Sequence, residues 1–193
     1  MSRGMYFITH PDVVIDPAVP VPQWPLSPRG RSRMQRLLSQ DWLRQVEAIY
    51  CSTEQKAVDG ALILSEATGI PFHQVSALGE NDRVATGYLA KAEFEVTVDA
   101  FFARPSESIR GWERAEAAQA RIVEALSWIA ETTPGAGSIA VVSHGGVGAL
   151  LLCSLKGRPI SRQEEQPGTS GGHYFLFQEP EGTLIHGWKP IDG

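Results

Sequence analysis

Residues 138–146 read SIAVVSHGG, an uncharged apolar run that leads into His144 and two glycines. A similar run, MYFITHP at residues 5–11, leads into His10. Uncharged β-branched and aromatic residues followed by turn-forming residues are typical of short buried strands. In an open α/β sheet, parallel strands end at a shared crevice, which is where such sheets bind ligands. The two runs therefore predict that His10 and His144 lie close together at one edge of a sheet.

Strand-like and helix-like segments alternate along the chain. Ser27-Pro28 predicts a helix start, with serine at the N-cap and proline at the first helical position. Ser52 or Thr53 is expected to cap a second helix that ends near Gly69. Near-helical spacing of apolar residues predicts a long helix over 106–131, with Trp112 and Trp128 in the core. The remaining expected elements are strands at 48–51, 72–75, 173–178 and 183–188, and a helix at 147–155.

This order predicts a three-layer α/β/α sandwich with a mixed, mostly parallel sheet, folded as a single domain over residues 1–193. Residues 76–105 are less periodic, and we expect them to form an excursion over the carboxyl edge of the sheet.

Composition excludes several classes of protein. The formal net charge of −5 argues against non-specific nucleic-acid binding. Cys51 and Cys153, the only cysteines, lie in apolar contexts and are expected to be buried thiols rather than a disulfide. No apolar run approaches the roughly 20 residues of a membrane helix, and no signal-peptide core is visible, so we expect a cytoplasmic protein without membrane contact. The oligomeric state cannot be read from the sequence.

Four motifs occur in a fixed order, with a short acidic segment between the third and the fourth. The four motifs are THP at 9–11, LSPRG at 26–30, STEQKAVDGA at 52–61 and SHG at 143–145, and the acidic segment is LGE at 78–80. Together they resemble the histidine phosphatase superfamily, which contains cofactor-dependent phosphoglycerate mutases and many small phosphatases. The family has Arg-His-Gly at the first motif, where this chain has Thr9-His10-Pro11. It has arginine at the third motif, where this chain has Lys56.

The resemblance implies phosphoryl transfer through a phosphohistidine, without a metal or another cofactor. His10 would be the nucleophile. Glu80 would protonate the leaving oxygen, a role that favours a raised carboxyl pKa. Glu54, Glu93 and Glu95 are alternatives that either approach the site or face solvent. The groups expected around the phosphoryl oxygens are Lys56, Arg83, His144, the Gly145 backbone N–H and Thr9. The Thr9 hydroxyl either contacts phosphate, or the residue is present only because threonine favours β-strands.

Arg83 is the first candidate to replace the charge that is missing at Thr9, ahead of Arg29 and Arg33, because it lies in the segment expected to overhang the site. Three functions follow from these features. The first is a phosphomonoesterase acting on a small phosphorylated metabolite or a phosphoprotein. The second is a catalytically weakened module that binds phosphorylated ligands. The third is a phosphoglycerate-type mutase, which ranks last because such mutases retain the arginine at the position of Thr9.

Overall fold

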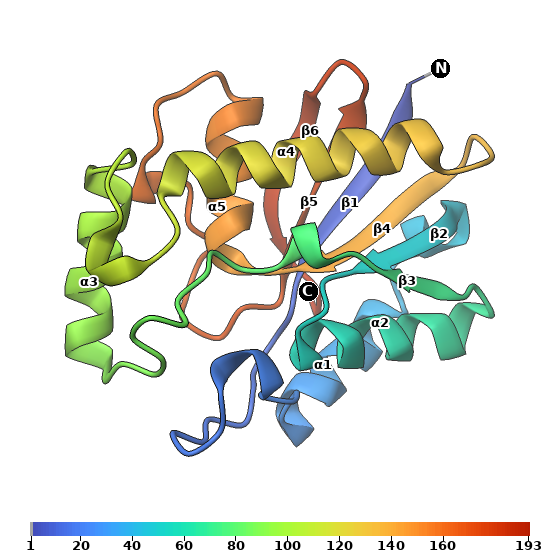
Figure 1. Ribbon diagram of the computed structural model, residues 1–193. Coiled ribbons are helices and arrows are strands. Elements are labelled where there is room, and N and C mark those ends of the chain that lie inside the picture. The colour runs from blue at the N-terminus through green and yellow to red at the C-terminus, as the bar shows by residue number, and fades with distance from the viewer. Residues whose placement is uncertain (1) are drawn as a thin grey trace.

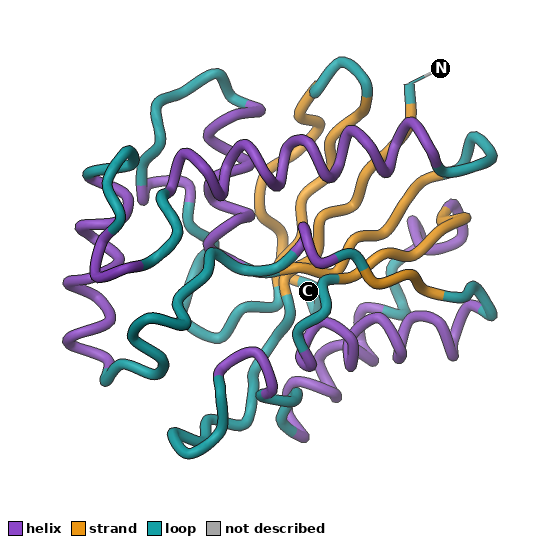
Figure 2. Tube along the Cα trace, viewed as in Figure 1, coloured by secondary structure: helices purple, strands orange, loops and turns teal. Residues whose placement is uncertain are grey.

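The computed structural model describes residues 2–193 and contains one six-stranded sheet flanked by helices (Figures 1 and 2). Its strands are β1 (Arg3–Thr9), β2 (Val46–Cys51), β3 (Phe72–Gln74), β4 (Ser138–Ser143), β5 (His173–Glu179) and β6 (Thr183–Pro190). They lie in the order β3-β2-β4-β1-β5-β6. β3, β2, β4 and β1 are mutually parallel, whereas β5 runs antiparallel to β1, and β6 antiparallel to β5. The predicted mixed, mostly parallel sheet is confirmed.

Helices cover both faces of this sheet. They are α1 (Pro28–Leu37), α2 (Gln55–Thr68), α3 (Lys91–Ala103), α4 (Ala115–Thr132) and α5 (Gly145–Leu155). Side chains alternate along β1, so Met5 and Phe7 join the core beneath α4 and α5. Tyr6 and Ile8 join the core against α1 and α2 on the opposite face. The three-layer α/β/α class is therefore confirmed, and Figure 1 shows the two helical layers on either side of the strands.

The first helix begins as the sequence predicts. The Ser27 hydroxyl accepts a hydrogen bond from the Gly30 N–H at 3.0 Å, and Pro28 is the first helical residue. Cys51 and Cys153 are buried free thiols, also as predicted. Within residues 2–193, no helix combines the length and the apolar character needed to cross a membrane.

The segment before α4 differs from the sequence prediction. The long helix begins at Ala115 rather than near residue 106, because Arg110 and Gly111 have φ values of 53° and 81°. This left-handed backbone cannot continue a right-handed helix. Trp112 is only 1% exposed and belongs to the core as predicted, but it lies in the turn rather than on the helix. The core prediction for Trp128 is wrong, because 53% of that residue is exposed on the outer face of α4. The excursion expected at residues 76–105 contains a full helix, α3, that its weak periodicity did not predict.

Candidate active site

The two histidines meet where β1 and β4 end. The parallel register pairs Thr9 with Ser143, so the next residue of each strand reaches the same edge of the sheet. The His10 N–H donates to the Ser143 carbonyl at 3.1 Å. The imidazole centroids of His10 and His144 are 5.2 Å apart, with the ring planes inclined at 64°. The juxtaposition predicted from the two strand patterns is present.

The environment of His10 favours a neutral imidazole with a defined tautomer. Its Nδ1 lies 2.9 Å from the Pro11 carbonyl oxygen. A carbonyl only accepts hydrogen bonds, so Nδ1 carries the proton and Nε2 keeps its lone pair. Burial lowers the pKa of His10 to about 3, with further contributions from His144 and Lys56. At neutral pH His10 therefore offers an uncharged nucleophilic nitrogen.

His144 is fully buried behind the cavity. Its Nε2 lies 2.6 Å from the Ser52 hydroxyl and 3.5 Å from Glu54 Oε1. Burial lowers the pKa of His144, an effect that the carboxylates of Glu54 and Glu80 oppose. Ser52 was expected as a possible cap of α2, but the N-cap residue is Glu54. The Ser52 hydroxyl instead accepts from the Glu54 N–H at 3.2 Å and links the start of α2 to His144.

Lys56 and Glu54 form a buried ion pair beside the histidines. Lys56 Nζ lies 2.6 Å from Glu54 Oε2 and donates to the Val21 carbonyl at 2.9 Å. Burial would raise the pKa of Glu54, but His144 and Lys56 outweigh it and hold that pKa at about 2. The ammonium expected to bind substrate is thus already paired with an internal anion. The sequence identifies Glu54 only as one of three alternatives to Glu80 and does not predict this ion pair.

Glu80 is held at the N-terminus of α5. Its carboxylate accepts hydrogen bonds from the N–H groups of Gly146 and Val147, both at 2.9 Å, and pairs with Arg83 at 3.4 Å. Burial would raise the pKa of Glu80, but Arg83, His144 and the Gly146 N–H outweigh it, so the pKa is lowered. The raised pKa expected for a proton donor is not found in the free protein. The cause is this set of contacts with cations and N–H donors, which stabilise the charged form.

The loop that carries Glu80 is fixed by a residue that sequence analysis missed. Arg121 of α4 donates to the carbonyls of Ala77, Gly79 and Glu80 at 2.7–3.2 Å. It also pairs with Glu113 at 2.8 Å. An arginine on a solvated helix face carries no local signal for such a role, because its partners lie about 40 residues away in the chain.

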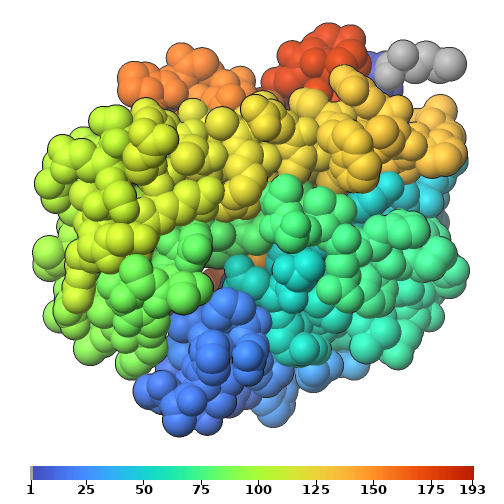
Figure 3. Space-filling model, viewed as in Figure 1, coloured from blue at the N-terminus to red at the C-terminus, as the bar shows by residue number. Residues whose placement is uncertain are grey.

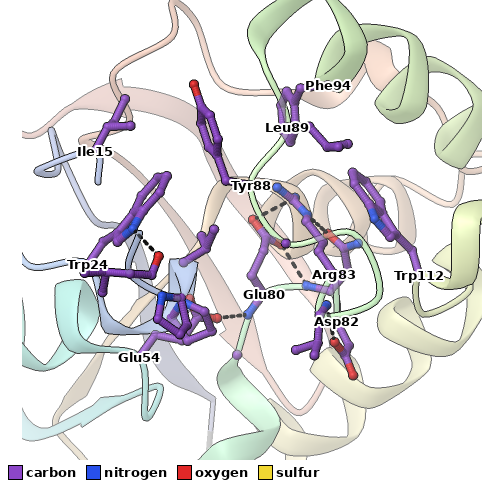
Figure 4. A pocket seen from close by; sticks show the side chains of 18 of the residues that line it. Ile15, Trp24, Glu54, Glu80, Asp82, Arg83, Tyr88, Leu89, Phe94 and Trp112 are labelled. Carbon is purple, nitrogen blue, oxygen red and sulfur yellow. Dashed lines mark hydrogen bonds and ion pairs between the residues drawn. The ribbon is translucent and has the colours of Figure 1, made fainter. Parts of the chain in front are cut away.

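Arg83 lies at the cavity wall, but it is not a free cation. Its guanidinium is stacked over Phe94 and Trp112, at 5.1 and 5.0 Å from the ring centroids. Nε donates to Asn81 Oδ1 at 2.9 Å. Figure 4 shows Arg83 between Glu80 and the aromatic side chains. The alternatives, Arg29 and Arg33, both pair with Asp12.

Thr9 and Gly145 occupy a tightly packed region rather than an open one. Thr9 is fully buried; its hydroxyl donates to Gln166 Oε1 at 2.6 Å and accepts from the His173 N–H at 3.0 Å. In the free protein the Thr9 hydroxyl is therefore held by Gln166 and His173. A Cβ atom added to Gly145 would collide with Gln166 Nε2. Gln166, which lies in a loop with no motif, therefore packs beside both positions.

A cavity of about 1070 Å³ opens onto His10. Its walls come from the loop of residues 15–24, from Thr53 and Glu54, and from residues 76–95. Figure 3 shows the molecular surface hollowed where these segments meet. Glu54, Glu80 and Arg83 line the cavity, whereas Lys56 and His144 do not and are only 4% and 0% exposed. The excursion after β3 therefore forms one wall of the candidate site.

Comparison of structures places this geometry among known folds. The chain superposes on Bacillus stearothermophilus YhfR with a TM-score of 0.79 and 23% identity, covering 96% of this chain and 95% of that chain. It superposes on a mycobacterial glucosyl-3-phosphoglycerate phosphatase in complex with inorganic phosphate with a TM-score of 0.78 and 20% identity, covering 99% of each chain. It superposes on phosphoglycerate mutase from Bacillus anthracis with a TM-score of 0.71 and 16% identity, covering 98% of this chain and 94% of that chain.

These likenesses, all below 25% identity, establish the fold. No curated protein matches the sequence. The family model of the histidine phosphatase superfamily (branch 1) matches residues 20–189, which is most of the chain. The motif order, the paired histidines and this match agree, and the protein belongs to the histidine phosphatase superfamily, branch 1.

Proposed function

We propose that the protein is a phosphomonoesterase that acts through a phosphohistidine on His10, with a small phosphorylated molecule as substrate. One observation carries the proposal. His10 lines the cavity, is neutral, and has Nδ1 bound to the Pro11 carbonyl, so that Nε2 is the available nucleophile. A neutral imidazole whose other nitrogen is held by a hydrogen bond suits in-line attack on phosphorus.

The reaction proceeds in two steps. His10 Nε2 forms a bond to phosphorus while the bond from phosphorus to the ester oxygen breaks, and the departing oxygen takes a proton. Water then attacks the phosphohistidine, loses a proton, and releases inorganic phosphate and free His10. We assign stabilisation of the phosphoryl oxygens to Arg83, which lines the cavity, and to the Gly145 N–H at the start of α5, because the Gly146 and Val147 N–H groups already donate to Glu80.

Proton transfer requires a carboxylate of the cavity, and we assign this role to Glu80. In the free protein its pKa is lowered by Arg83, His144 and the Gly146 N–H, which together outweigh burial. A bound phosphoryl dianion places a like charge beside the carboxylate, and a like charge raises a carboxyl pKa. Substrate binding itself therefore shifts Glu80 toward the protonated form that donates to the leaving oxygen.

Replacement of His10 tests the proposal. The His10→Ala variant is expected to lose turnover of p-nitrophenyl phosphate by about 10³-fold or more and to form no acid-labile phosphoenzyme. His73→Ala is the matched control, because His73 is an exposed histidine of β3 outside the cavity. Retention of more than about a tenth of the wild-type rate in His10→Ala would remove His10 from the nucleophile role.

The ion pair between Glu54 and Lys56 favours a second candidate, a module that binds phosphorylated ligands with weak turnover. Because the internal carboxylate neutralises Lys56, less positive charge is available to stabilise a transferring phosphoryl group. Such a module would bind a phosphomonoester without releasing phosphate or forming a phosphoenzyme. The same assay on the wild-type protein separates the two functions.

A further inference from the structure

The cavity beyond His10 is lined mainly by apolar side chains. Trp24 and Tyr88 meet across it with ring centroids 5.7 Å apart and planes inclined at 53°. Figure 4 shows these rings, with Ile15, Leu89 and Phe94, facing the cavity on the side away from Asp82. The full set of large apolar or aromatic lining residues is Ile15, Val19, Val21, Trp24, Val84, Tyr88, Leu89, Phe94 and Trp112.

Several of these apolar side chains are left exposed in the free protein. Ile15 is 60% exposed, Val84 77% and Tyr88 43%. They come from two separate segments, the loop before α1 and the part of the excursion that precedes α3. Both segments line the same cavity. Exposed apolar side chains gathered around one concave site mark a ligand-binding surface, because a bound apolar group removes them from water.

The charges along the same walls disfavour a second anion on the ligand. The lining cations are Arg83 and Lys91, and Arg83 is already paired with Glu80. Four carboxylates line the same cavity, those of Glu54, Glu80, Asp82 and Glu95. Glu54 is paired with Lys56 and Glu95 with Arg162, which leaves Lys91 and Asp82 as the lining charges without an ion pair among the described residues. A second phosphate or a carboxylate on the substrate would thus enter a wall with no surplus of positive charge.

We propose that the substrate is a phosphomonoester whose alcohol half is bulky and apolar and carries no second anionic group. This inference rests on the proposed function, since the phosphoryl group is placed at His10. The alcohol half extends from His10 toward Trp24 and Tyr88 and buries the exposed side chains at the cavity mouth. The cavity volume of about 1070 Å³ far exceeds what a phosphate group alone needs.

A pair of aryl phosphates tests the inference. Phenol and 2-naphthol are leaving groups of similar pKa, so their phosphates differ mainly in apolar area. We expect kcat/KM for 2-naphthyl phosphate to exceed that for phenyl phosphate by about tenfold, because the second ring is buried in the cavity. 3-Phosphoglycerate, which carries a carboxylate, is expected to be the poorest of the three. A naphthyl-to-phenyl ratio near one, or a preference for 3-phosphoglycerate, would overturn the inference.

Variants of the apolar wall localise the effect. Tyr88→Ser is expected to lower the naphthyl-to-phenyl ratio by about threefold. Val96→Ser is the matched control, because Val96 is 70% exposed on α3 and does not line the cavity. Leu89→Lys adds a cation to the wall and is expected to improve turnover of 3-phosphoglycerate. An equal loss in the Tyr88 and Val96 variants would contradict the assignment.

Binding measurements separate this inference from the proposed function. If no phosphate ester is turned over, the phosphomonoesterase proposal fails, but the affinities of 2-naphthyl and phenyl phosphate can still be compared by titration calorimetry. About tenfold tighter binding of the naphthyl ester, lost in Tyr88→Ser, would support an apolar ligand without catalysis. Equal affinities would overturn the inference whatever the fate of the proposed function.

Discussion

Replacing Glu54 by glutamine is expected to strengthen phosphate binding rather than weaken it. Glu54 lines the cavity, and its carboxylate lies between His144 Nε2, at 3.5 Å, and Lys56 Nζ, at 2.6 Å. Those two are among the groups that the family resemblance assigns to the phosphoryl oxygens. The Glu54 carboxylate thus occupies the position between these two groups. An incoming phosphate has to compete with it for their hydrogen bonds and charge.

The expected change in Kd follows from the free-energy cost of displacing the Glu54 carboxylate. Protonation is unfavourable at neutral pH, because the pKa of Glu54 is held at about 2 by His144 and Lys56 against the effect of burial. Rotation away from Lys56 breaks a buried ion pair, which typically costs about 3 kcal/mol or more. The Glu54→Gln variant escapes this cost, and because about 3 kcal/mol corresponds to a factor of at least 100 in affinity, its Kd for inorganic phosphate is expected to fall about 100-fold.

Titration calorimetry with inorganic phosphate at pH 7 measures the change directly. Glu95→Gln is the matched control, since Glu95 lines the same cavity but pairs with Arg162 rather than Lys56. It is expected to leave the Kd nearly unchanged. In the double variant Glu54→Gln, Lys56→Met the gain should disappear, because no freed ammonium remains. Weaker phosphate binding in a normally folded Glu54→Gln protein would refute the reasoning and show that the Glu54 carboxylate positions the phosphate-binding groups rather than competing with phosphate.

Three further outcomes are expected. Glu80→Gln should lose much more activity on alkyl phosphates than on p-nitrophenyl phosphate, whose leaving group departs without a proton; equal losses in parallel rate assays would point to positioning instead. Thr9→Arg should lower the free energy of unfolding in denaturant titrations by about 1–3 kcal/mol or more, because the side chain it replaces is fully buried. The Tm should fall steadily from pH 7 to pH 4: the pKa values of His10 and His144 are lowered by burial, so the unfolded chain takes up protons first as pH drops below about 6.5. A constant Tm over that range would contradict the pKa shifts.

Much of the architecture is readable from local patterns. The apolar runs before His10 and His144 predict parallel strands, and the sheet pairs Thr9 with Ser143 so that both histidines reach one edge. The helix start at Ser27 follows from capping chemistry. The start of α4 could not be placed, because apolar spacing continues through Ile109 and Trp112 across a left-handed turn. Periodicity reports which side chains are buried, and a buried turn gives the same signal as a helix.

The candidate site was harder to predict, because its electrostatics depend on contacts between distant segments. The family motif identifies position 56 as a cation, but nothing in the local sequence shows that Glu54 neutralises it. The N–H groups at the N-terminus of α5 donate to the Glu80 carboxylate, which lies 66 residues away in the chain. This contact helps to lower the pKa of Glu80, which its proposed role predicts to be raised. Gln166 and Arg121 lie outside every motif, and only the folded chain brings them to Thr9 and to the Glu80 loop.

The two residues that depart from the family pattern, Thr9 and Lys56, each contact a polar side chain that no motif predicts. Where the family has an arginine, the short Thr9 side chain lies under Gln166, which accepts its hydrogen bond and packs against Gly145. Where the family has a second arginine, Lys56 is tied to Glu54 and to the Val21 carbonyl of the cavity loop. At each position where the family arginine is absent, a polar side chain, Gln166 or Glu54, thus occupies the space that an arginine would need. Restoring either arginine alone therefore places a charge in an occupied space, and recovery of a strongly cationic pocket requires changing Gln166 or Glu54 at the same time.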